Sequence, residues 1–149
     1  MSIQGLVNPS IDQKLYPIFV SSINGQSEND VYVNLPSAVI TAQVGQILRF
    51  HISGILLNGT DQTGIPKQFL FYWNIVGGVL GTMTVRLKSS NQITVYAEAV
   101  LNTTTPVYPT PIASMINPLP TGKGTIDLII DTDSPCNSSI IPLALEIIY

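Results

Sequence analysis

An alternating stretch runs from Val44 to Gly59 and reads VGQILRFHISGILLNG. Apolar and polar side chains take turns along its first half, which places the apolar ones on one face of an extended strand. The apolar set is Leu48, Phe50 and Ile52, and the polar set is Arg49, His51 and Ser53. The stretch closes on Asn58-Gly59, a dipeptide that tolerates positive φ angles. The sequence therefore predicts a half-buried β-strand over Gln46–Ser53, followed by a turn.

Several other runs alternate in the same way or are rich in β-branched and aromatic residues. The expected strands cover Leu15–Val20, Val31–Leu35, Ala38–Val44, Phe69–Val76, Thr82–Lys88, Ile93–Leu101, Gly124–Asp131 and Ile140–Tyr149. Thr82–Lys88 and Ile93–Leu101 flank a Ser-Ser-Asn turn and predict a hairpin. Phe69–Val76 is apolar at both odd and even positions and predicts a strand covered on both faces. Pro17 and Pro142 predict edge or bulge positions, because proline cannot donate to a ladder.

These strands, with almost no helical periodicity, predict an all-β fold. Five prolines between Asn102 and Gly124 predict a long loop there, with a short edge strand near Val107 or Ala113–Ile116. Long connections alternate with short ones, which favours a single-domain antiparallel β-sandwich, and within that class an eight-stranded jelly roll. An immunoglobulin-like sandwich is the alternative. Residues 1–13 are expected to form an irregular N-terminal arm, and residues 14–149 the domain.

The composition is unusually poor in charge. Charged residues make up 10% of the chain, against about 25% in an ordinary soluble domain. The 44 Ser, Thr, Asn and Gln residues outnumber the 15 charged ones, so the surface must be mostly neutral. Such surfaces repel their copies weakly, which favours self-association over a neutral, lectin-like monomer. The six basic residues are scattered, so nucleic acid is not an expected partner.

The cysteine count and the hydropathy of the chain indicate where the protein is made and whether it enters a membrane. A single cysteine, Cys136, cannot form a disulfide within the chain. The N-terminal residues lack the basic and apolar regions of a signal peptide. No apolar run approaches the roughly 20 residues that cross a bilayer. We therefore expect synthesis in a cytosol and no membrane insertion.

Few residues suggest chemistry. His51 has no histidine or cysteine at zinc-ligand spacing, and we expect neither catalytic residues nor a cofactor, and therefore no enzymatic activity. Asp127, Asp131 and Asp133 share a strand face and its exit, and they resemble part of a calcium-loop pattern that lacks its glycine and glutamate. They are the candidate calcium ligands. The alternative is that they are solvent-facing or subunit-interface carboxylates.

The aromatic segment has two interpretations. The aromatic side chains are Phe69, Phe71, Tyr72 and Trp73. They could form a stacking platform for a sugar or a base. We favour packed core, because aromatic side chains bury the largest apolar areas and the chain has few others.

The texture of the whole chain carries a family resemblance. It lies in the runs Ala38–Val44, Gln46–Leu57, Lys67–Val76, Thr82–Leu101 and Gly124–Asp131, with the Pro/Thr-rich loop 102–120 between them. These runs resemble the single jelly-roll structural proteins of icosahedral viruses, namely vertex (penton), minor capsid and spike proteins. The chain lacks the arginine-rich N-terminal arm of small capsid proteins that contact a genome, so genome contact is not implied.

The resemblance implies a virion structural protein made in the host cytoplasm. Such a subunit would form a homo-oligomer, a pentamer or a trimer, through strand edges and neutral faces, and would contact other virion proteins. The alternative function is a carbohydrate-binding or receptor-binding jelly-roll module whose partner is a host glycan or receptor.

Overall fold

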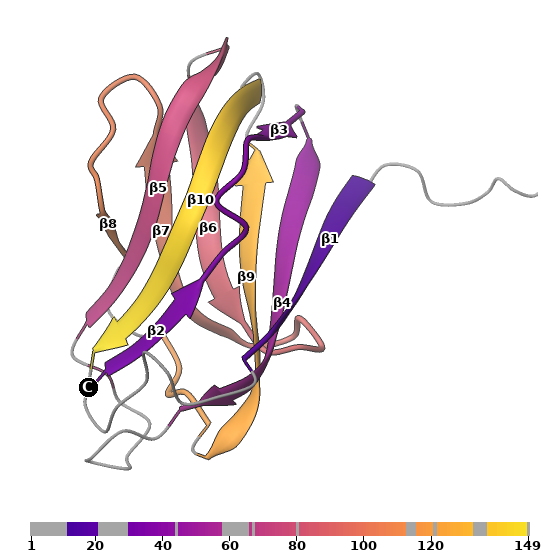
Figure 1. Cartoon of the computed structure of the whole chain (residues 1–149), viewed down its shortest axis with the longest axis vertical. Coiled ribbons are helices and arrows are strands. Elements are labelled where there is room, and N and C mark those ends of the chain that lie inside the picture. The colour runs from indigo at the N-terminus through magenta and orange to yellow at the C-terminus, as the bar shows by residue number, and fades with distance from the viewer. Residues whose placement is uncertain are drawn as a thin grey trace, which may run out of the picture.

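The computed structural model describes residues 12–20, 30–43, 45–57, 66, 68–79, 81–112, 116–120, 122–132 and 137–148. These residues form ten strands and no helix. The strands are β1 (Asp12–Phe19), β2 (Asp30–Asn34), β3 (Ile40–Ala42), β4 (Gln46–Leu56), β5 (Gln68–Val79), β6 (Thr82–Lys88), β7 (Val95–Asn102), β8 (Thr110–Ile112), β9 (Lys123–Thr132) and β10 (Asn137–Ile148). Two sheets face each other (Figure 1). The chain is an all-β sandwich, as the sequence predicts.

The strand pairing is nested around one hairpin. The first sheet has the order β1-β4-β9-β6-β7, and the second has the order β2-β10-β5-β8 with β3 also paired to β10. The expected hairpin is present as β6 and β7. Outside it, β5 pairs with β8, β4 pairs with β9, and β2 and β3 both pair with β10, all antiparallel. Sequence neighbours such as β4 and β5 therefore lie in opposite sheets.

Strand β1 departs from the predicted antiparallel sandwich because it pairs with β4 in parallel. It is an edge strand, which agrees with the prediction from Pro17. It begins at Asp12, two residues inside the expected arm. Residues 1–11 of that arm lie outside the described part of the chain.

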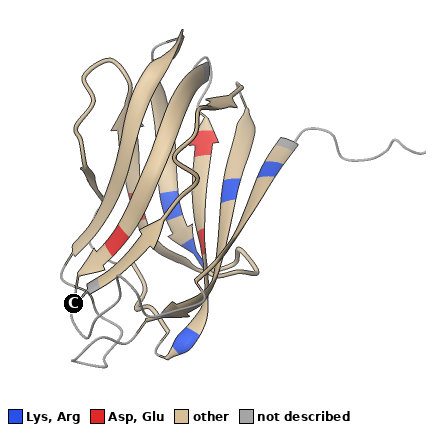
Figure 2. Ribbon diagram, viewed as in Figure 1, with Lys and Arg blue, Asp and Glu red and all other residues tan. Residues whose placement is uncertain are grey.

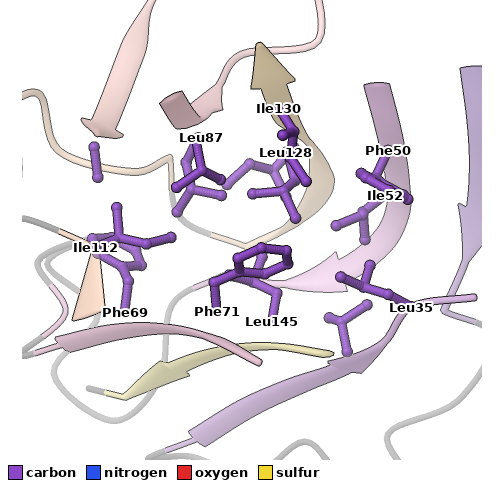
Figure 3. Close-up of a cluster of buried hydrophobic side chains, with 14 of the residues drawn as sticks. Leu35, Phe50, Ile52, Phe69, Phe71, Leu87, Ile112, Leu128, Ile130 and Leu145 are labelled. Carbon is purple, nitrogen blue, oxygen red and sulfur yellow. The ribbon is translucent and has the colours of Figure 1, made fainter. Parts of the chain in front are cut away.

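The core lies between the two inner faces (Figure 3). From β4, the predicted set Leu48, Phe50 and Ile52 is fully buried. Figure 3 labels Phe50 and Ile52 of this set together with Leu35, which follows β2, and residues from strands of both sheets, namely Phe69, Phe71, Leu87, Ile112, Leu128, Ile130 and Leu145. Burying each large apolar side chain contributes about 1.5–3 kcal/mol, so this layer is the main source of stability.

Strand β5 corrects one expectation. Phe69, Phe71 and Trp73 are buried core residues, as favoured from the sequence. Tyr72 is only half-buried and Asn74 is exposed, so the strand is not covered on both faces. The even positions include an aromatic residue, which suggested a covered face. An aromatic side chain can, however, lie on a solvated face and bury only part of its ring.

Most strand boundaries differ from expectation by a few residues, and two segments differ more. The strand expected over Ala38–Val44 is reduced to β3, and the short edge strand of the proline-rich loop is β8, between the two predicted positions. Pro142 lies in the central strand β10, at a bulge. The pairing with β5 skips Leu143, whereas Pro142 is paired with Trp73, and the main-chain oxygen of Pro142 accepts from Ser37 in the break between β2 and β3. The missing N–H of proline is tolerated at such an irregular position.

We predict opposite outcomes for two neighbouring substitutions in β4. Phe50→Asp places a carboxylate in the core, which costs several kcal/mol of a stability that is typically about 5–15 kcal/mol, so the chain should not fold. His51→Ala removes an outward-facing, half-exposed side chain and should leave the fold intact, with unfolding easier by about 1–2 kcal/mol. Far-UV circular dichroism and urea unfolding measure both. An unfolded His51→Ala protein would contradict this assignment of the two faces.

Candidate functional site

A buried carboxylate lies on the outer face of the first sheet. Asp127 of β9 is opposite His51 of β4 in the strand register, and its side chain is 0% exposed. Arg49 Nε donates to Asp127 Oδ2 at 2.7 Å, and His51 Nδ1 lies 2.8 Å from Asp127 Oδ1. Each oxygen of this carboxylate therefore has a partner from β4.

Arg49 also ties this group to the loop between β6 and β7. Its Nη2 donates to the main-chain oxygen of Ser90 at 2.9 Å. A buried carboxylate is tolerated only when charge and hydrogen bonds compensate its lost hydration. Arg49 supplies both the compensating charge and a hydrogen bond. We call Arg49, His51 and Asp127 the Asp127 cluster.

A second ionic group lies beside the first. Arg86 of β6 bonds Glu98 of β7 at 2.6 Å and lies 3.5 Å from Asp131 of β9. Ile129 lies opposite both Arg49 and Arg86 in the register, and it is 3% exposed although it faces outward. Charges of both signs therefore compensate one another within this face, where the bands of both colours concentrate in Figure 2.

These contacts bear on the predicted calcium site, because they involve two of its three candidate ligands. Asp127 and Asp131 both point outward from β9, and each accepts a bond or an ion pair from an arginine. Asp133 lies outside the described residues. Among the residues that are described, no group of three or more His, Cys, Asp or Glu side chains could hold a metal ion. The described carboxylates thus act as partners of arginine.

The cluster has part of the geometry of acid–base catalysis. A buried aspartate that holds one ring nitrogen of a histidine fixes the orientation of the imidazole. In the described part of the chain, no hydroxyl or thiol is hydrogen-bonded to His51. Cys136 lies outside that part. The contacts present join β4 to β9 through Asp127.

The outer face of the second sheet has a different character. Tyr32 of β2 and Tyr72 of β5 have ring centroids 5.8 Å apart, and Tyr72 donates to Glu146 Oε1 at 2.7 Å. Leu70 of β5 lies opposite Glu146 and next to Pro111 of β8 in the register. We call these five residues the tyrosine face.

The tyrosine face is nearly free of charge. Two charged residues lie on the strands of this sheet, namely Asp30 at the start of β2, whose side chain is not described, and Glu146, which accepts from a tyrosine hydroxyl. Figure 2 shows an acidic band on β10. Sequence reasoning missed this face because Tyr32 and Tyr72 lie 40 positions apart, and only the shared partner strand β10 brings them together.

The described sheet edges are blunted. Strand β1 contains Pro17, and the three-residue β8 contains Pro111. The edge formed by β2 and β3 is interrupted at residues 35–39, which include Pro36. The edge of β7 is bonded by the main chain of Ile116 and the side chain of Asn117. Proline and interruption are devices that oppose strand addition, so these edges do not favour a continuous sheet between copies.

We predict that Asp127 contributes more to stability than the neighbouring exposed acid. Asp127→Asn should lower the free energy of unfolding by about 1–3 kcal/mol, because the largely buried guanidinium of Arg49 loses its counter-charge. Glu98→Gln is the matched control on the same face, and its effect should stay below about 1 kcal/mol, because exposed pairs contribute little. Urea unfolding of both variants measures the difference. Equal effects would contradict the role given to the buried carboxylate.

Comparison with known proteins finds no relative of this chain. No family model, curated protein or solved structure matches the chain. Within the described residues, no helix is long and apolar enough to cross a membrane. Function therefore has to be argued from the sandwich, its two outer faces and its composition.

Proposed function

We propose that the sandwich is a jelly roll. The supporting observation is the nested pairing of the eight strands that begin with the interrupted strand β2/β3 and continue from β4 to β10. The first pairs with the last, the second with the seventh, the third with the sixth and the fourth with the fifth. A long antiparallel hairpin rolled into two sheets produces this order, and jelly rolls occur in viral capsid and lectin domains. Strand β1 is an addition outside the roll.

We further propose that the protein is a non-enzymatic virion structural subunit, a capsid vertex (penton), minor capsid or spike protein. The observation that carries this is the combination of a nearly uncharged outer face with blunted sheet edges. A sandwich of this kind associates through faces, because neutral faces repel one another weakly and exclude water at low cost. This revises the expected route, in which strand edges shared the role with faces.

The proposed partners follow from this role. Copies of the chain would meet around a symmetry axis, as a pentamer or a trimer, and would also contact other virion proteins. The protein would be located in the virion after synthesis in the host cytoplasm. Its internally compensated ionic face gives no continuous basic surface for nucleic acid.

A second candidate function is carbohydrate or receptor binding. The observation that favours it is the tyrosine face, where two aromatic rings lie beside a carboxylate that can accept from sugar hydroxyls. Aromatic rings stack on sugar rings, and a neighbouring carboxylate or amide supplies the directional bonds. A glycan array read with wild type and Tyr72→Ala tests this function, and a blank array would exclude it.

We predict that the protein forms a stable oligomer through the tyrosine face. Sedimentation velocity at micromolar concentration should give a mass of three or five chains. Leu70→Arg should shift the distribution toward monomer, because it places an unpaired charge in the contact. Thr104→Arg adds the same charge on an exposed loop and is the matched control. A wild-type monomer, together with the absence of the protein from purified particles, would contradict the proposed function.

A further inference from the structure

Strand β1 is attached to the sandwich in a way that no other strand is. It forms the one parallel pair among the described strands, and its ladder is with β4 alone. It lies outside the nested order that joins β2 to β10. In Figure 1 it forms the outermost strand of the first sheet. The rest of the sandwich is therefore complete in its pairing without β1.

The edge of β4 is shaped to receive this strand. Gly54 has a φ of +76°, and a Cβ atom there would lie 2.6 Å from the main-chain oxygen of Val20. Val20 N–H donates to Ser53 O at 2.9 Å, one residue before that glycine. A side chain at Gly54 would therefore collide with the docked chain. A glycine is therefore required at the point where the chain that follows β1 passes β4.

Strand β1 also completes a small inner contact. The Tyr16 ring stacks on Phe50, with centroids 5.1 Å apart and planes 20° apart. Ile18 and Val20 pack against the same core. Burial raises the pKa of the Tyr16 hydroxyl above its ordinary value, as expected for a ring covered by the sandwich. Without β1, the eleven residues of β4 would present a long bare edge and an uncovered Phe50.

The outward-facing side chains of β1 are apolar and exposed. Leu15 is 57% exposed and Phe19 is 72% exposed. Pro17 lies between them on the same side of the strand and removes a donor from the free edge. This side therefore favours side-chain packing by a neighbour over addition of a further strand.

We propose that, in the assembled protein, β1 is exchanged between copies, so that β1 of one copy occupies the β4 edge of the next. This rests on the self-association argued under the proposed function. The parallel ladder, the Gly54 passage and the Tyr16–Phe50 stack form equally well within one chain or between two, because the sequences are identical. Exchange therefore costs little and links the copies without a new interface.

The connection to the rest of the chain is long enough for this exchange. Nine residues, 21–29, separate Val20, which is bonded to β4, from the start of β2. A fully extended chain of that length spans about 30–32 Å, which is roughly the diameter of a small domain. Within an oligomer already held by its faces, a neighbouring β4 edge then lies at high effective concentration.

Cysteine pairs placed across the ladder test the exchange. Phe19 and Ser53 are register partners, so Phe19→Cys and Ser53→Cys bring two thiols to bridging distance. Both changes are made in a Cys136→Ser background to remove the native thiol. The oxidised oligomer fraction is then run on denaturing gels without reductant. We expect more than half of the chains in covalently linked multimers.

A mixed experiment removes ambiguity about the origin of the bridge. Chains with only Phe19→Cys are co-expressed with tagged chains carrying only Ser53→Cys. A covalent heterodimer should form in this mixture at least tenfold more than in either single-variant preparation. A monomeric, intrachain bridge in an intact oligomer would overturn the exchange and leave the proposed function standing. A protein that never forms an oligomer would overturn both.

Gly54 supplies an independent measurement with a matched control. Gly54→Ala should abolish the cross-chain disulfide and shift the oligomer toward monomer, because the added methyl group excludes Val20. Gly45→Ala is the control, since Gly45 also has a φ of +76° but has open space around its Cβ position. Both variants should retain the far-UV spectrum of the sandwich. Equal oligomer loss in the two would overturn the inference.

Discussion

Burial of one side-chain face from each strand between the two sheets is the constraint on which the rest of the structure depends. Because alternate residues share a face, a one-residue slip of β4 would bury Arg49 and His51 in place of the apolar set. The same alternation brings Asp127 to the outer face, opposite His51. A buried carboxylate without its partners costs several kcal/mol. The ionic cluster therefore disfavours the same slipped registers that the core disfavours, and the two faces of β4 specify one alignment on β9.

Much of the fold could be predicted from side-chain alternation. The hairpin of β6 and β7, the faces of β4 and the run of β9 all follow from a period of two, and each is present as expected. Strand direction is different, because alternation is identical in parallel and antiparallel pairs. The parallel placement of β1 depends on where its connection runs, and the sequence of β1 carries no sign of it. Pro17 predicted the edge position but not the partner strand.

The candidate sites were harder to predict because they join distant positions. Asp127 and His51 are 76 residues apart. Their contact depends on the register between two strands, and that register cannot be read from the sequence. The interpretation of Asp127 as one of three clustered carboxylates used spacing along a single strand. In the sandwich its partners, Arg49 and His51, come from the adjacent strand β4. The tyrosine face has the same origin, since β10 aligns β2 with β5.

Low charge and blunted edges act together on how such a chain can associate. A neutral surface lacks the repulsion that keeps domains apart, so bare strand edges would invite unlimited pairing. Proline in β1 and β8 and the break between β2 and β3 limit that route. The long edge of β4 is the exception, because it is covered by β1, a strand outside the nested order of β2 to β10, and it receives this strand at a glycine that no other residue could replace without collision. An edge that accepts one defined strand in one direction permits closed assembly, whereas an open edge permits fibres.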